Sequence, residues 1–216
     1  MIIRRATLED VPAMIQVKES LAFDGHSETA TSTNGGFLLG ADAKGYMARI
    51  SCGCSWVLDV DGVKGFSIVL PDQALRLSEL WHRRSEIEWS TTFDDLESKK
   101  LGYFDQLAVS KGTWRTHAPV LSITTVLDFL SMQPDYLLST TVLKPVQNLA
   151  AVPYLQYLGA TRVGKIDEVD PNVGQLLSEV WLAKQDSLRH FLEHPPSEKI
   201  ASYIDQAHLH FNRYNL

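Results

Sequence analysis

The chain has 216 residues, 44% of them hydrophobic and 21% charged, which is enough length and apolar content for one folded domain with a sizeable core. Its net charge of -6 at pH 7 argues against a nucleic-acid-binding surface, because phosphate binding needs clustered Lys and Arg. The two cysteines, Cys52 and Cys54, have no second His or Cys pair nearby, so the sequence excludes a four-ligand structural zinc site.

The N-terminal segment is expected to contain a strand, a helix and a loop. A short apolar run at 2–6 predicts a strand, and an apolar stripe over 11–17 recurs at the spacing of a helix. Residues 22–40 are small, polar and interrupted by glycines, which predicts an irregular loop.

A β-hairpin is expected next in the chain. The β-rich runs 55–60 and 63–70 flank Asp61-Gly62, which is the strongest short signal for an antiparallel hairpin. The charged and apolar mixture at 73–89 is interpreted as helical, and most of its large apolar residues as packing residues.

The middle of the chain reads as a strand, a helix and a second strand. The run LGYFDQLAV at 101–109 predicts a strand, and 136–143 predicts another. Between them, 119–130 carries one apolar stripe and opens with Pro119, which a helix tolerates in its first turn.

The segment KPVQNLAAVPYLQYLGATRVG, residues 144–164, is the most informative part of the sequence. Asn148 is expected to open a short helix that Gly159 ends in a left-handed conformation, and a strand follows at 161–166. A further strand is expected at 175–184, and two helices separated by Pro195-Pro196 complete the chain.

Three of these features together resemble the GNAT superfamily of N-acetyltransferases. They are the D-G-x-x-G-F hairpin, the strand ending in Leu-Ala-Val, and the Asn-x-x-Ala helix that ends in Leu-Gly before a strand. The resemblance covers about residues 1–184 and implies an α/β fold with a mixed, twisted sheet flanked by helices. Residues 185–216 are then a C-terminal helical extension, which either forms a homodimer contact or covers an exposed sheet edge.

The resemblance implies that acetyl-CoA is the co-substrate and that no metal is needed. Its pantetheine arm is expected against the backbone of Leu107, Ala108 and Val109, and its amide region near Asn148. Its pyrophosphate is expected at the N-terminus of the Pro119 helix, where unpaired N–H groups favour an anion. The residues assigned to that loop are Arg115, Thr116, His117 and Ala118.

This loop lacks the glycines that the family uses, and two registers remain open. Arg115 to Val120 match the family loop if one residue is inserted, and otherwise Trp114, His117 and Pro119 occupy the glycine positions. In either register Pro119 removes one backbone donor.

Acid–base chemistry is assigned to three residues. Tyr103 and Asp105 are the base candidates, and alternation along a regular strand places them on one face with Leu107 and Val109. In the family a Tyr near position 155 often protonates the leaving thiolate; here that position is Leu155, and Tyr154 is the acid candidate.

The expected function is transfer of an acetyl group from acetyl-CoA to a primary amine, on a small molecule or a peptide, by direct attack in a ternary complex. The alternatives are a GNAT-shaped binding or regulatory module without catalysis, and acyl transfer from a charged transfer RNA, which the acidic net charge disfavours. The longest apolar runs are shorter than a membrane span, so we expect a cytoplasmic protein without a nucleic-acid or membrane partner.

Overall fold

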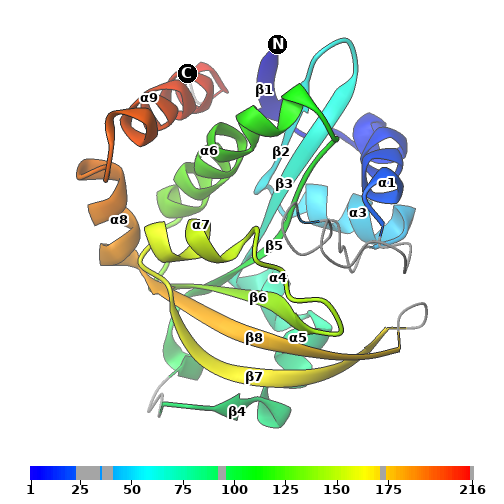
Figure 1. The fold of residues 1–216 in the computed structure, drawn as a ribbon, viewed down its shortest axis with the longest axis vertical. Coiled ribbons are helices and arrows are strands. Elements are labelled where there is room, and N and C mark those ends of the chain that lie inside the picture. Colours follow the sequence, from blue (N-terminus) through cyan, green and yellow to red (C-terminus); the bar gives the residue numbers. More distant parts are fainter. Residues whose placement is uncertain (23–34, 36–40, 92–95, 171–173, 215–216) are drawn as a thin grey trace.

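The computed structural model describes residues 1–22, 35, 41–91, 96–170 and 174–214. These residues form an eight-stranded sheet in the order β1-β2-β3-β5-β6-β8-β7-β4, with helices on both faces (Figure 1). The mixed α/β architecture expected from the sequence is therefore confirmed. The strands are β1 (Ile2–Arg5), β2 (Ser55–Asp59), β3 (Val63–Pro71), β4 (Glu88–Trp89), β5 (Leu101–Val109), β6 (Tyr136–Lys144), β7 (Thr161–Asp170) and β8 (Gly174–Lys184).

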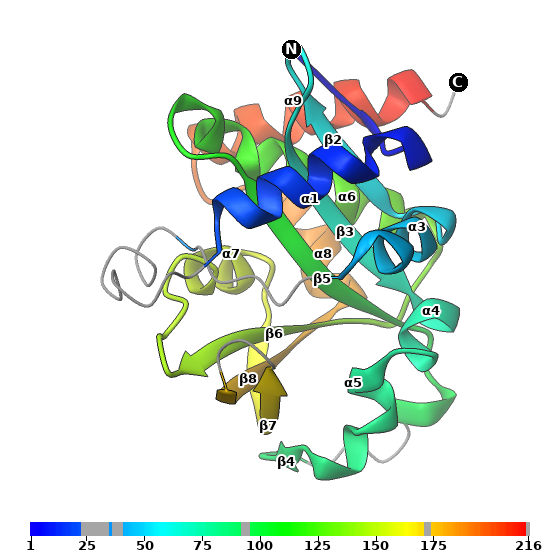
Figure 2. The same ribbon diagram turned by 90° about the vertical axis from the view of Figure 1, so that its right-hand side faces the viewer.

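The helices divide between the two faces of the sheet, as Figure 2 shows. One apolar layer lies under α1 (Val11–Ser20), α3 (Ala43–Ser51), α4 (Asp72–Arg76) and α5 (Glu79–His82). The other lies under α6 (Ala118–Ser131), α7 (Val152–Tyr157), α8 (Gln185–Glu193) and α9 (Glu198–Tyr214). Burying apolar side chains on both faces of one sheet gives the protein two cores.

The strands β5 and β6 form the only parallel pair among the described strands, and they separate after four residues. Residues 101–104 pair with 136–139, whereas 105–109 pair only with β3, and β6 from Thr140 onward pairs only with β8. The α6 helix supplies the long crossover that a parallel pair requires. The sheet is thereby opened between two of its central strands (Figure 1).

A β-bulge at Asp105 changes which side chains share a face of β5. Ile68 is paired with Gln106 and Val69 with Phe104, so Asp105 is the extra residue on its strand. The bulge shifts the alternation by one position. As a result Leu107 and Val109 pack into the α6 layer, while Tyr103 packs into the α1 layer. The prediction that Tyr103 and Asp105 share a face with Leu107 and Val109 was wrong.

The hairpin and the end of α7 agree with the sequence. Strands β2 and β3 pair antiparallel across Asp61-Gly62. Gly159 follows α7 with a φ of 71°, the left-handed conformation expected of a helix stop. The described part of the predicted loop at 22–40 is limited to Ala22 and Gly35; the rest lies outside the described residues.

The start of α7 differs from the prediction. The helix begins at Val152, and Asn148 lies in the turn before it, where its backbone N–H donates to the Val142 carbonyl at 2.8 Å. Pro153 explains the difference: it fits the first turn of α7, but in a helix beginning at Asn148 it would lie in the interior and remove a hydrogen bond.

One further segment differs from its prediction as a single helical stretch, and another had no prediction. Residues 73–89 form α4, α5, a 3-10 turn (Arg84–Glu86) and β4, because Ser78 caps a new helix by accepting from the Trp81 N–H at 3.3 Å. Residues 43–51 form α3, which no pattern had indicated; Asp42 caps it by accepting from the Gly45 N–H at 2.8 Å.

The two helices predicted for the C-terminus are present. Helix α9 packs against α6 and against the edge strand β1, with Ile204 and Ala207 buried in the contact. The extension thus packs over β1 in the same layer as α6, and a homodimer contact stays a prediction.

Candidate active site

A cavity of about 620 Å³ lies where β5 and β6 separate. Because the sheet itself is open here, the cavity is lined from both layers: by η4 (Thr113–His117), α6 and α7 on one side, and by α3, α5 and β7 on the other. Eight of the residues predicted for the site line it. They are Tyr103, Asp105, Leu107, Val109, Arg115, Ala118, Asn148 and Tyr154.

Three predicted residues lie away from the cavity lining. Ala108 is 1% exposed and packs in the α1 layer, on the other face of β5 from Leu107 and Val109. Thr116 is exposed, and its hydroxyl donates to the Thr113 carbonyl at 2.7 Å. His117 is half-buried at the residue preceding α6. Ala108 can therefore contribute only backbone to the cavity wall.

The N-terminus of α6 is continuous with the 3-10 turn η4. The N–H of Ala118 donates to the Arg115 carbonyl, and Pro119 has no N–H to offer. Two of the donors expected for a pyrophosphate are thus absent or engaged. Of the charged side chains in this turn, that of Arg115 lines the cavity.

Two polar contacts mark the centre of the cavity on the α1 side. The hydroxyls of Tyr103 and Thr140 lie 2.6 Å apart and join β5 to β6 at the point where the strands separate. The Nε–H of Arg49 donates to Asp105 Oδ2 at 2.7 Å, and the Asp105 side chain is 11% exposed. Burial raises the pKa of the Asp105 carboxyl, and the charge of Arg49 opposes that rise.

Arg49 was not among the residues predicted for the site. Its position on α3 could have been suggested by Asp42, a residue type that favours helix N-caps. Nothing in the local pattern, however, indicates that this helix brings Arg49 to a strand 56 positions further along the chain.

The α7 side of the cavity contains two buried polar atoms without hydrogen-bond partners among the described residues. They are Asn148 Oδ1 and the hydroxyl oxygen of Tyr154. Burial raises the pKa of Tyr154, and an interaction with the Ser122 side chain opposes the rise. The Ser122 hydroxyl donates to the Pro119 carbonyl at 3.0 Å and keeps its lone pairs as acceptors. Buried groups of this kind are nearly always paired, and both residues line the cavity, so a ligand that displaces the side chains enough to reach these atoms would supply the missing partners.

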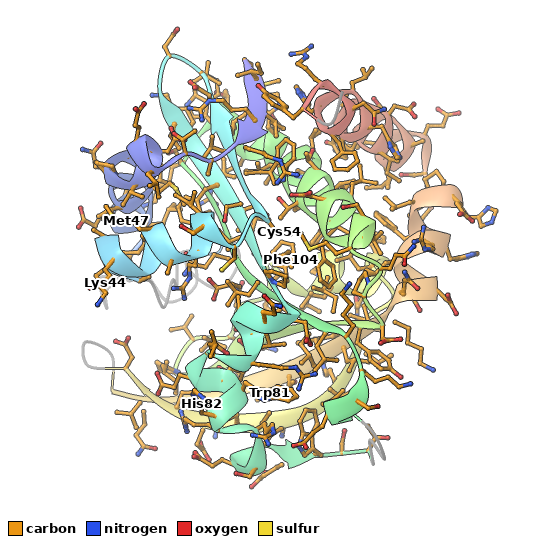
Figure 3. The ribbon with its side chains drawn as sticks, turned by 180° about the vertical axis from the view of Figure 1, so that it is seen from behind. Lys44, Met47, Cys54, Trp81, His82 and Phe104 are labelled. Carbon is orange, nitrogen blue, oxygen red and sulfur yellow. The ribbon has the colours of Figure 1, made fainter. Side chains whose placement is uncertain are left out.

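The Tyr154 ring packs edge-on against Phe104, with ring centroids 6.0 Å apart. Figure 3 places Phe104 in the middle of the molecule, where the two parts of the sheet meet. Since Phe104 belongs to the paired part of β5, its ring gives the Tyr154 side chain a fixed support beside the opening.

The opposite end of the cavity carries carboxylates. Glu168 and Asp170 of β7 and Glu79 of α5 line it together with Arg83. Arg83 donates to Glu86 Oε2 through both Nε and Nη2 at 2.9 and 2.8 Å, and to the Asp167 carbonyl. The Ser178 hydroxyl donates to Glu168 Oε2 at 2.7 Å.

Across the described ranges, no three His, Cys, Asp or Glu side chains gather in a way that could hold a metal ion. Among the same residues, every helix is too short or too polar to cross a membrane.

Solved structures share this arrangement at low sequence identity. FeeM, an N-acyl amino acid synthase from uncultured soil microbes, superposes with a TM-score of 0.52 and 15% identity over 89% of this chain and 93% of its own. The yncA protein of Salmonella typhimurium, a provisionally assigned acetyltransferase solved with acetyl-CoA, gives 0.51 and 14% over 86% and 94%. BCP1 from Saccharomyces cerevisiae gives 0.55 and 10% over 94% and 90%.

No protein-family model matches the chain, and no curated protein matches its sequence. At identities of 10 to 15%, the structural similarities show the fold alone, and the chemistry depends on this chain's own residues. They confirm the GNAT-like fold that the sequence predicted.

Proposed function

We propose that this chain, which has the GNAT fold, is an N-acetyltransferase that moves the acetyl group of acetyl-CoA to a primary amine. The observation that carries the proposal is the cavity between β5 and β6, with Asn148 Oδ1 and the Tyr154 hydroxyl unpaired in its wall. A ligand rich in amide and carbonyl groups would satisfy both atoms.

The residues of the cavity fit the coenzyme in three places. The backbone of 105–109 has no strand on its β6 side, which leaves peptide groups to pair with the amides of an extended arm. Asn148 lies opposite, and the Arg115 side chain supplies a positive charge at the end near α6. Arg115 is the chain's main candidate for the phosphates, since the adjacent helix start offers few free donors.

Acetyl-CoA supplies the activated acetyl group as a thioester, and the protein must deprotonate the attacking amine and protonate the leaving thiolate. The amine nitrogen forms the new C–N bond, the C–S bond breaks, and one proton passes from the nitrogen to the sulfur.

Asp105 is a better base candidate than Tyr103. Burial raises the pKa of the Asp105 carboxyl, so its ionised form binds a proton more readily than that of an ordinary Asp, and the charge of Arg49 opposes the rise. Burial and the charge of Asp105 also raise the pKa of Tyr103, which keeps its hydroxyl protonated and unable to act as a base.

Tyr154 is suited to the acid role. Its raised pKa keeps the hydroxyl protonated, and that hydroxyl donates to no group among the described residues.

A second candidate function is a binding or regulatory module without catalysis. The observation that favours it is the N-terminus of α6, where the Ala118 N–H is engaged and Pro119 has none. A helix N-terminus with so few free N–H donors would bind a pyrophosphate weakly, while the cavity itself stays open.

The two candidates are separated by binding and turnover measured on the same preparation. If acetyl-CoA binds the native state, it raises the melting temperature by roughly 5 to 10 °C at a concentration near 100 times Kd. Release of free CoA thiol in the presence of a panel of primary amines then reports transfer. Binding without thiol release across the panel would favour the module, and no binding of acetyl-CoA would contradict both.

A further inference from the structure

The cavity is electrostatically asymmetric. On the α6 and α7 side, Arg115 is the one charged side chain among the described lining residues. On the other side, four carboxylates face the cavity with only two guanidinium groups. The carboxylates are those of Glu79, Asp105, Glu168 and Asp170, and the guanidinium groups those of Arg49 and Arg83.

Both arginines on the acidic side already have a carboxylate partner. Arg49 pairs with Asp105 at 2.7 Å. Arg83 pairs with Glu86, which does not line the cavity. The charges of Glu168 and Glu79 contribute to a raised pKa of Arg83, so this guanidinium offsets part of their negative charge, while its hydrogen bonds go to Glu86 and to the Asp167 carbonyl.

Glu168 is the interior member of this group. It is half-buried, accepts one hydrogen bond from Ser178, and forms no ion pair within the part of the chain that the structure describes. On β7 it shares a face with Ile166, which is 1% exposed, so its carboxylate is directed over the concave face of the sheet. Its negative charge contributes to the raised pKa of Tyr103, so its field reaches the centre of the cavity.

We propose that Glu168, held by Ser178, selects acceptors that carry a second ammonium group, so that the preferred substrates are diamines or polyamines. The reacting amine lies by Asp105 while the distant ammonium pairs with Glu168, and the exposed Glu79 adds negative charge at the mouth. The preference for diamines as substrates rests on the proposed transferase function. The binding of a diamine by Glu168 does not.

Asn148 and Tyr154, which are proposed to meet the coenzyme, lie on the α7 side of the same cavity, so its acidic side is left for the acceptor. Asp105 and Glu168 lie on strands β5 and β7, which are three positions apart in the sheet order. Three strand spacings correspond to about 14 Å where all the strands are paired, and the separation of β5 from β6 at Asp105 widens one of the three. The geometry therefore favours an extended acceptor over a short one.

The test compares acceptors that differ only at their far end. Each diamine from 1,4-diaminobutane to 1,8-diaminooctane is paired with the monoamine and the amino carboxylic acid of the same length. We expect the best diamine to have a KM at least tenfold lower than its monoamine, and the amino acid to be the poorest of the three.

Glu168→Gln keeps the size of the side chain and its bond with Ser178 while removing the charge. It should raise the KM of the best diamine about tenfold, leave the monoamine KM unchanged, and leave kcat with both nearly unchanged. Glu193→Gln, an exposed position on α8, is the matched control and should change none of these values.

Calorimetric binding of the same diamine to the wild-type protein and to Glu168→Gln separates the two proposals. Diamine binding that is lost in Glu168→Gln, but with no acetylation of any amine, supports the inference and contradicts the transferase function. Acetylation that proceeds equally well on monoamines and diamines, or that is insensitive to Glu168→Gln, overturns the inference and leaves the transferase function standing.

Discussion

The two parts of β5 have different neighbours and different properties. Residues 102–104 are paired on both sides, with β3 and with β6, and Leu101 and Phe104 are buried. Residues 105–109 are paired only with β3, and on the β6 side the cavity takes the place of a strand. The cavity is therefore formed by the backbones of β5 and β6, which separate from each other, and its presence does not depend on any one small side chain.

The largest effect is expected in the paired part, at Gly102. A Cβ at this position would lie 2.2 Å from two ring carbons of Phe129 on α6, so the helix packs directly on the strand backbone. Gly102→Ala should lower the free energy of unfolding by about 3 kcal/mol, because the ring or the helix must move. Denaturant unfolding measures the loss.

A second substitution tests whether the Phe129 ring is the group that a Cβ at position 102 would meet. Phe129→Leu should cost about 1 kcal/mol in the wild-type background but recover part of the stability of Gly102→Ala. Additive losses in the double variant would show that the Phe129 ring is not the obstacle.

The paired part of β5 was predictable from sequence, and the separation was not. LGYFDQLAV reads as one uniform strand, and it is one along β3. The bulge at Asp105 depends on the register with β3, and the separation depends on where β6 turns away. Both are relations between distant segments, which a local pattern does not record.

Residues of the cavity lining could be predicted where a local sequence pattern indicates them, and could not where they depend on contacts between distant segments. Leu107, Val109 and Asn148 follow from the strand end and the turn before α7, and they line the cavity. Arg49 depends on the packing of α3 across the sheet, so sequence periodicity gave no reason to include it. Ala108 was included for its backbone, and alternation along β5 directs its side chain into the α1 layer.

The next effect is expected at the junction of the two parts, where Asp105 is the extra residue. Asp105→Asn keeps an acceptor for Arg49 but cannot take up a proton, and it should lower kcat/KM about 100-fold. In the wild type, kcat/KM should rise with pH through the pKa of Asp105, which lies above that of an ordinary Asp, because only the ionised carboxyl accepts a proton. The variant should lose this limb of the profile.

Substitution of Arg49 tests more directly whether Asp105 is the group that titrates in the pH profile. Burial raises the pKa of Asp105 and Arg49 opposes the rise, so Arg49→Gln should move the limb to higher pH. Asp186→Asn, at an exposed position on α8, is the control. A profile that Arg49→Gln leaves in place would mean that another group titrates.

A smaller effect is expected in the open part, at Tyr154. Because the hydroxyl has no partner among the described residues, Tyr154→Phe should leave the free energy of unfolding unchanged or raise it by up to about 1 kcal/mol. Turnover should fall about tenfold, a modest loss because the raised pKa makes this Tyr a weak acid. Tyr157→Phe, at a 49% exposed position of the same helix, should change neither quantity. If Tyr154→Phe instead lowers the free energy of unfolding together with turnover, the hydroxyl has a packing role.

The smallest effect is expected where the two parts meet across the strands. Tyr103 and Thr140 share a hydrogen bond of 2.6 Å at the last point before β5 and β6 separate. Thr140→Val leaves the Tyr103 hydroxyl without this partner and should cost about 1 kcal/mol of unfolding free energy. Tyr103→Phe alone should cost a similar amount, whereas the double variant, which removes both polar groups, should cost less than the sum. A coupling energy near zero would mean that the hydrogen bond does not hold the strands together, and the separation would then be maintained by β3 and β8 alone.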